Sequence, residues 1–196
     1  MNTMQNKDYK VRDHRNNNNH DNTGRSTNRR NQRPNQKLKK PRSGFIKANC
    51  DANLSVDGRW GLGAIFRDEK GQVVASATWE RSGFNEPATA EAFALYLTTR
   101  LVLECCFTSV EFESDCFTVV KSVNSPEPSS RSYFGNMIRG VQVNIARFRQ
   151  CSFKHIDRKA NRAAHSLAGL AHSNPDYIRL EETHPLIVPI VLMDLF

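Results

Sequence analysis

The chain has 196 residues, of which 38% are hydrophobic, and its 28 basic and 20 acidic residues give a formal charge of +8. This length allows one domain of ordinary size with a tail, because so few hydrophobic residues can form a core in only part of the chain. No stretch approaches the roughly 20 consecutive apolar residues that a membrane helix needs, so we expect no membrane span.

The positive charge is concentrated at the N-terminus. Residues 1–45 contain 12 basic and 3 acidic residues, whereas the rest of the chain carries a net charge of −1. Polar segments with so few large aliphatic side chains cannot bury enough apolar surface to fold. We therefore predict a disordered basic tail, rich in Asn and Arg, over residues 1–44. A folded domain is expected over residues 45–174, and residues 175–196 would be an extended apolar segment of the same domain.

The cysteines indicate an intracellular protein. All five lie in apolar surroundings without Cys-x-x-Cys spacing, and the N-terminus has no hydrophobic run. These features predict reduced thiols and no secretion. The tail would be a poor organellar transit peptide and only a fair nuclear signal, so we expect the protein in the nucleus or the cytoplasm.

The first half of the folded part has the alternation typical of β-strands, followed by a helix. Turn-forming clusters of hairpin length, Asp57-Gly58 and Asp68 to Gly71, separate three apolar stretches. After Pro87, which suits a first helical turn, apolar residues recur at helical spacing. The predicted elements are antiparallel strands over 46–53, 60–67 and 73–81 and a helix over 88–104.

The second half alternates strands and helices. Pro126 and Pro128 end a short helix, and an alanine-rich helix follows the last strand. A meander that runs into β-α-β crossovers implies an α/β fold, with a five-stranded mixed sheet flanked by helices. The predicted elements are strands over 109–114 and 151–156 and helices over 116–123, 133–148 and 160–171.

Three carboxylates stand where they could converge. Asp51 lies near the end of the first strand, Glu91 on the apolar stripe of the first helix, and Asp115 directly after the fourth strand. Taken singly, Asp51 could accept turn hydrogen bonds, Glu91 could interact with the helix dipole and Asp115 could cap the next helix. As a set they fit a carboxylate cluster that hard divalent cations stabilise. Two such ions roughly 4 Å apart are the arrangement that hydrolyses phosphodiesters.

Several short motifs follow one another along the chain in a characteristic order. They are Lys47 to Asp51, Gly61 to Asp68 with Gly71, Ala90 to Ala92, Val110 to Cys116, Phe153 to His155, Ala160 to Ala164, Pro185 to Pro189 and Leu192 to Leu195. In series they resemble a ribonuclease H domain of the plant, reverse-transcriptase-associated kind that occurs in retroelements and in proteins derived from them. The resemblance runs from about Ile46 to the C-terminus.

The resemblance implies a ribonuclease H-like fold whose second strand is antiparallel to the others. It also implies a metal-dependent endonuclease that cleaves the RNA strand of RNA/DNA hybrids. Asp51, Glu91 and Asp115 match metal ligands for two Mg²⁺ or Mn²⁺ ions. His155 matches a mobile histidine associated with product release, and Asn161 matches a residue near the nucleic-acid backbone.

The chain departs from the family at His165, where the family carries a fourth aspartate. Neutral imidazole is a softer ligand than carboxylate and adds no negative charge, so we expect Mg²⁺ binding to weaken more than Mn²⁺ binding. His165 follows Asn161 by one helical turn and should face the site. Two hypotheses stay open: a weakened ribonuclease H in which His165 belongs to the catalytic site, and a catalytically inactive nucleic-acid-binding protein of retroelement origin.

The source of affinity for nucleic acid is a separate question. Some ribonucleases H hold the hybrid with a basic protrusion, but the corresponding residues 125–140 contain only Arg131 and Arg139 as bases. The tail could supply salt-sensitive phosphate contacts instead, although a nuclear import signal and a leftover polyprotein linker are alternatives. We expect a monomer that binds RNA/DNA hybrids; a protein-interaction module that uses residues 186–196 is a third hypothesis. The candidate tail contacts are Arg29, Arg30, Lys39, Lys40 and Arg42.

Overall fold

Alternating apolar residues form one mixed sheet within residues 39–125 and 131–195, the part of the chain that the computed structural model describes. The first three strands form the predicted antiparallel meander, and the next two join it parallel to β1. The strand order is β5-β4-β1-β2-β3-β6. The strands are β1 (Ile46–Asn53), β2 (Arg59–Arg67), β3 (Val73–Ser82), β4 (Ser109–Ser114), β5 (Gln150–His155) and β6 (Tyr177–Leu180).

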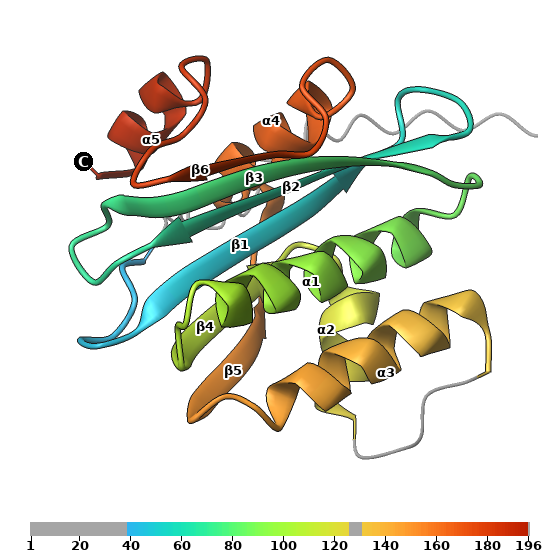
Figure 1. Ribbon diagram of the computed structural model, residues 1–196, viewed down its shortest axis with the longest axis horizontal. Helices are drawn as coiled ribbons and strands as arrows, with labels where there is room; N and C mark the ends of the chain where they lie inside the picture. Colours follow the sequence, from blue (N-terminus) through green and yellow to red (C-terminus); the bar gives the residue numbers. More distant parts are fainter. Residues whose placement is uncertain (1–38, 126–130, 196) are drawn as a thin grey trace, which may run out of the picture. The chain divides into compact units, whose positions relative to one another are not determined.

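Helices cover both faces of the sheet, as a β-α-β topology requires (Figure 1). The face that carries α1, α2 and α3 is opposite the face that carries α4 and α5. A short 3₁₀ turn, η1 (Arg158–Ala160), connects β5 to α4. None of the described helices is long and apolar enough to cross a membrane. The helices are α1 (Pro87–Glu104), α2 (Phe117–Asn124), α3 (Tyr133–Ile145), α4 (Arg162–Leu170) and α5 (Val188–Leu195).

The described sheet has six strands, one more than the sequence predicted. Residues 177–180 form β6, which pairs antiparallel with β3 at the edge of the sheet. Three of its four side chains are exposed, and four residues are too few to show the apolar alternation on which the prediction depended. The apolar segment beyond it forms α5. Ile187, just before this helix, and Val191 within it pack against α4.

The hydrophobic core has two parts because the strands are buried on both sides. Ala48 and Cys50 of β1 belong to the larger cluster beneath α1, α2 and α3. Ile65 of β2 belongs to a smaller cluster with α4 and α5. The side chains of β1 alternate between the two faces, so Asp51 faces α4 while Cys50 faces α1.

Charged residues continue the core on the α4 side of the sheet. Lys47 and Glu113 are buried and form an ion pair of 2.7 Å. Arg67 is 2% exposed and lies 2.9 Å from Asp194 of α5. Asn49 connects the two pairs, because it donates to Glu113 at 3.1 Å and accepts from Arg67 at 3.3 Å. Breaking such a buried pair leaves an uncompensated charge, so this network fixes α5 to the centre of the sheet.

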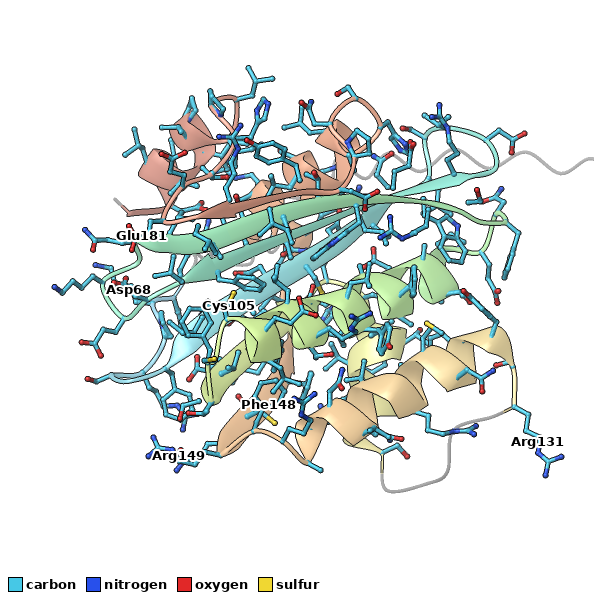
Figure 2. All side chains as sticks on the ribbon, in the orientation of Figure 1. Asp68, Cys105, Arg131, Phe148, Arg149 and Glu181 are labelled. Carbon is cyan, nitrogen blue, oxygen red and sulfur yellow. The ribbon has the colours of Figure 1, made fainter. Side chains whose placement is uncertain are left out.

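The predicted turn between β2 and β3 is present. Asp68 lies at its start (Figure 2), and its Oδ1 accepts the backbone N–H groups of Lys70 and Gln72. Gly71 has a φ of 87°, a conformation that favours glycine. The turn therefore needs both residue types that the sequence places there.

Candidate metal and nucleic-acid site

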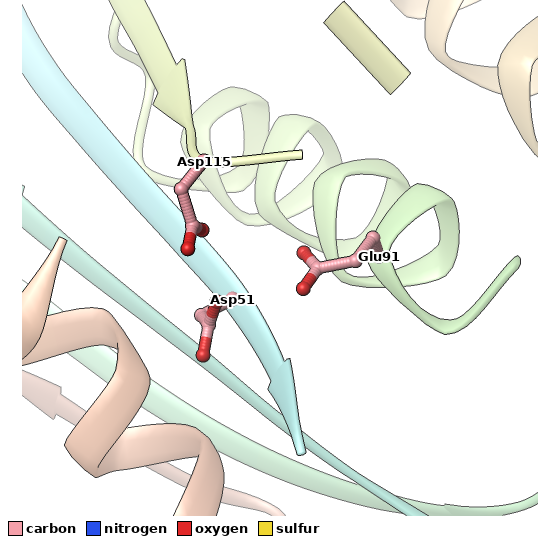
Figure 3. A group of neighbouring side chains, drawn as sticks. All are labelled: Asp51, Glu91 and Asp115. Atoms are coloured by element: carbon pink, nitrogen blue, oxygen red, sulfur yellow. The ribbon is translucent and has the colours of Figure 1, made fainter. Parts of the chain in front are cut away.

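Three carboxylates converge at one edge of the sheet. β1 and β4 are adjacent and parallel, so Asp51 near the end of β1 and Asp115 just after β4 reach the same edge. α1 begins at that edge, because β3 runs parallel to β1, and Glu91 lies in its second turn. One oxygen of each carboxylate lies within 4.8 Å of the others, and the side chains point toward one another (Figure 3). The predicted cluster is therefore present.

The cluster is electrostatically strained without a cation. Burial, reinforced by the negative charge of Asp115, raises the pKa of Asp51 to about 7, while the contact with His165 opposes this rise. Burial and the charges of Asp51 and Asp115 raise the pKa of Glu91 well above its usual value. Its partial relief comes from the Ala52 backbone N–H and the charge of Arg158. A divalent cation would remove this repulsion.

Asn161 positions one of the carboxylates. Its Nδ2 donates to Asp115 Oδ1 at 2.8 Å and to the backbone oxygen of Cys50 at 2.9 Å. Asn161 therefore fastens Asp115 to β1, the strand that carries Asp51. Asn161 is 1% exposed and holds the site together, and the place near the nucleic-acid backbone that the resemblance implies for it stays a prediction.

His165 faces the cluster from α4, as the helical spacing predicts. Its Nδ1 donates to Asp51 Oδ2 at 2.6 Å. On the other side of the ring, Arg158 Nη2 lies 3.4 Å from Nε2. His165 is thus a partner of Asp51 in this structure, at the position where the resemblance implies another carboxylate.

His155 lies beside the cluster at the end of β5. Its side chain is exposed, and Nε2 is 3.1 Å from the backbone oxygen of Asp115. The ring of Phe117, 62% exposed, meets the imidazole edge-on at a centroid distance of 5.7 Å. The location fits the resemblance, while a role in product release stays a prediction.

The predicted tail contacts that the structure describes, Lys39, Lys40 and Arg42, lie away from the cluster. Arg29 and Arg30 lie outside the described residues. Arg42 forms an ion pair of 2.6 Å with Glu111, near the start of β1. Lys39 and Lys40 line a small pocket at that same end of the strand, away from the carboxylate edge.

Sequence reasoning missed a basic segment next to the site. Between the end of β5 and the start of α4, the chain places Lys154, Arg158, Lys159 and Arg162 on the surface. Only Asp157 offsets these four charges within the segment. The sequence signal was the close spacing of these four bases over residues 154–162. The region that corresponds to a basic protrusion, residues 125–140, is only partly described, because residues 126–130 lie outside the described part. Its Arg131, just before α3, points outward (Figure 2).

The donor set fits a hard divalent cation. All three groups supply carboxylate oxygens, which Mg²⁺ and Mn²⁺ prefer. Oε2 of Glu91 is buried and has no hydrogen-bond partner among the described residues, and such an atom needs a compensating ligand. Asp51, Glu91 and Asp115 are therefore the residues that would hold the metal.

Comparisons with known proteins agree with this geometry. A family model described as reverse transcriptase-like matches residues 49–171. RNase H1 from the halophilic archaeon Halobacterium salinarum NRC-1 is 19% identical, with a TM-score of 0.61, and the match covers 66% of this chain and 98% of that chain. The N-terminal RNase H domain of a Mycobacterium tuberculosis protein is 18% identical, with a TM-score of 0.60, and the match covers 66% of this chain and 94% of that chain.

A third solved structure contains nucleic acid. LC11-RNase H1 in complex with an RNA/DNA hybrid is 19% identical, with a TM-score of 0.55, and the match covers 62% of this chain and 92% of that chain. No curated protein matches the sequence. At these identities the structures establish the fold alone, and that fold is the ribonuclease H-like fold expected from the sequence motifs.

Proposed function

Because this chain belongs to the reverse transcriptase-like family, we propose that it is a metal-dependent endonuclease that hydrolyses the RNA strand of RNA/DNA hybrids. The observation that carries this proposal is the convergence of Asp51, Glu91 and Asp115 within 4.8 Å at one sheet edge. Support comes from the shared fold with an RNase H1 that was solved with such a hybrid.

Each residue of the site has a task in the proposed reaction. The carboxylates would hold the cation, which, when bound, stabilises negative charge on the scissile phosphate and lowers the pKa of a bound water. Asn161 positions Asp115 through its 2.8 Å hydrogen bond. Exposed His155 lies beside Asp115, where its imidazole could contact the departing strand. The bases around η1 would contact the phosphate backbone.

The test is cleavage of labelled nucleic acids by the purified full chain in Mg²⁺ and in Mn²⁺. We expect the RNA strand of a hybrid to be cut, with double-stranded DNA and double-stranded RNA left intact. Cleavage should stop in chelator and in Asp115→Asn, whose amide oxygen still accepts the hydrogen bond from Asn161. Cutting of every substrate alike, or full activity of Asp115→Asn, would contradict the proposal.

The second candidate is a nucleic-acid-binding protein without catalytic activity, and His165 is the observation that favours it. The imidazole occupies an oxygen of Asp51 and adds no carboxylate. Under this alternative, the wild type binds the hybrid equally well in chelator and cuts it in neither metal. His165→Asp would then restore cutting if only the missing carboxylate prevents it. Retroelement origin stays a prediction.

The basic segment next to the site should supply hybrid affinity. We expect the double variant Lys154→Ala/Lys159→Ala to weaken hybrid binding about tenfold. The slope of log affinity against log salt concentration should become shallower, by the equivalent of up to about two phosphate contacts. Binding is measured in chelator over a salt series, so that cleavage does not interfere. Lys70→Ala, at the turn between β2 and β3, is the matched control and should bind like the wild type. Arg29→Ala/Arg30→Ala tests the tail in the same way, and a larger loss there would assign the affinity to the tail.

A further inference from the structure

The oxygens of the carboxylate cluster are divided between protein donors and free positions. Asp51 gives Oδ2 to His165 at 2.6 Å, and Asp115 gives Oδ1 to Asn161 at 2.8 Å. Glu91 receives the backbone N–H of Ala52, and its Oε2 has no partner among the described residues. Asp51 and Asp115 also share a side-chain hydrogen bond, which a bound cation would replace. Each carboxylate could then offer one oxygen to a single cation that keeps several waters.

His165 leaves no ligand for a second cation. Its Nδ1 is engaged by Asp51, and its Nε2 faces Arg158 Nη2 at 3.4 Å. A ring nitrogen binds a metal through the lone pair that it would otherwise use as an acceptor. With both nitrogens engaged, the imidazole blocks the α4 side of Asp51 rather than extending the metal site.

The net charge of the site also indicates one divalent cation instead of two. Three carboxylates and the Arg158 guanidinium have a combined charge of −2, which one divalent cation neutralises. A fourth carboxylate at position 165, with Arg158 still present, would give −3, which is more than one divalent cation neutralises. Arg158 is also close enough to act on Glu91, where its positive charge opposes the rise in pKa that burial and the neighbouring carboxylates cause.

We propose that this site holds one divalent cation instead of two, and that Arg158, held against the ring of His165, takes the place of the second. The inference rests on the proposed function only in requiring that the cluster binds a divalent cation. His165 is then a positioning residue that orients Asp51, and Arg158 adds its positive charge on the side of Glu91, both without contacting the metal. Position 165 decides the number of ions that the fold accepts.

The experiment counts Mn²⁺ ions on the full chain by equilibrium dialysis and by electron paramagnetic resonance. We expect the wild type to bind one ion per chain with the spectrum of isolated Mn²⁺. His165→Asp should bind two, with the exchange-coupled spectrum of neighbouring ions. His165→Gln is the matched control, because it removes the imidazole without adding a carboxylate, and it should bind one. Glu91→Gln should lose the ion, which assigns it to the cluster.

The outcomes separate this inference from the proposed function. Two coupled ions on the wild type, no ion at all, or an ion that Glu91→Gln retains would each overturn the single-cation site. Two ions on His165→Gln would also overturn it, since the count would then not depend on a carboxylate. One bound ion without cleavage of hybrids would sink the nuclease and leave the single-cation site standing. Cleavage of hybrids by a wild type that binds two ions would support the nuclease and overturn the single-cation site.

Discussion

Replacing Gly63 with alanine is expected to lower the midpoint of thermal unfolding by about 10 °C. Gly63 lies on β2 directly beneath α4. A Cβ at this position would be 2.3 Å from the backbone nitrogen of Ala168 and 2.6 Å from the backbone oxygen of Ala164. Backbone cannot rotate away as a side chain can, so α4 must move off the sheet. The midpoint is measured by circular dichroism on the full chain.

Gly169→Ala, on α4 itself, is the matched control for Gly63→Ala. Its added Cβ would meet only Asn53 Nδ2, at 3.9 Å, and alanine is the better helix former by up to about 1 kcal/mol. We expect its unfolding midpoint to equal or slightly exceed that of the wild type. A Gly63→Ala midpoint within about 2 °C of the wild type would show that α4 does not pack as described.

Gly63→Ala should also damage the metal site. Asn161 precedes α4 and His165 lies on it, and both contact the carboxylates. A displaced α4 therefore loosens Asp51 and Asp115 together. Mn²⁺ affinity should fall in Gly63→Ala and stay unchanged in Gly169→Ala, which connects the packing of a glycine to the chemistry at the sheet edge.

The carboxylates of the cluster could be predicted because each stands at a recognisable position in the local sequence pattern. Asp51 and Asp115 stand at the ends of apolar strands, and Glu91 occupies the apolar stripe of a helix. The strand order that brings them together follows from the meander and the crossovers. Their convergence within 4.8 Å is therefore a consequence of topology.

The partners of these carboxylates could not be predicted from local pattern. Asn161 and Asp115 are separated by 46 residues, and His165 and Asp51 by 114. The helical spacing showed that His165 faces the site, but not that Asp51 and Arg158 engage both its nitrogens. Lys47 was also uninformative in sequence, because a charged residue on a strand ordinarily marks a solvated face, whereas here it is 2% exposed.

Stability should depend on pH through the buried carboxylates when no divalent cation is present. The pKa of Asp51 rises from 3.8 to about 7 on folding, so the folded state binds its proton more tightly than the unfolded state does. The stability that this proton contributes is complete below about pH 4 and is lost as the pH rises through about 7. Holding Asp51 ionised in the folded protein then costs on the order of 4 kcal/mol. The raised pKa of Glu91 acts in the same direction.

Asp51→Asn removes this titration while its amide oxygen can still accept the Nδ1–H of His165. In chelator at about pH 8 we expect the variant to unfold about 10 °C above the wild type, and at about pH 4 the two should nearly coincide. Mn²⁺ should raise the midpoint of the wild type at about pH 8 and leave Asp51→Asn unchanged, because a ligand that binds only the folded state stabilises it. Differential scanning calorimetry at a series of pH values measures both effects. Superimposable curves for the two proteins in chelator would mean that Asp51 ionises without cost, and the electrostatic strain that makes this cluster a metal site would be absent.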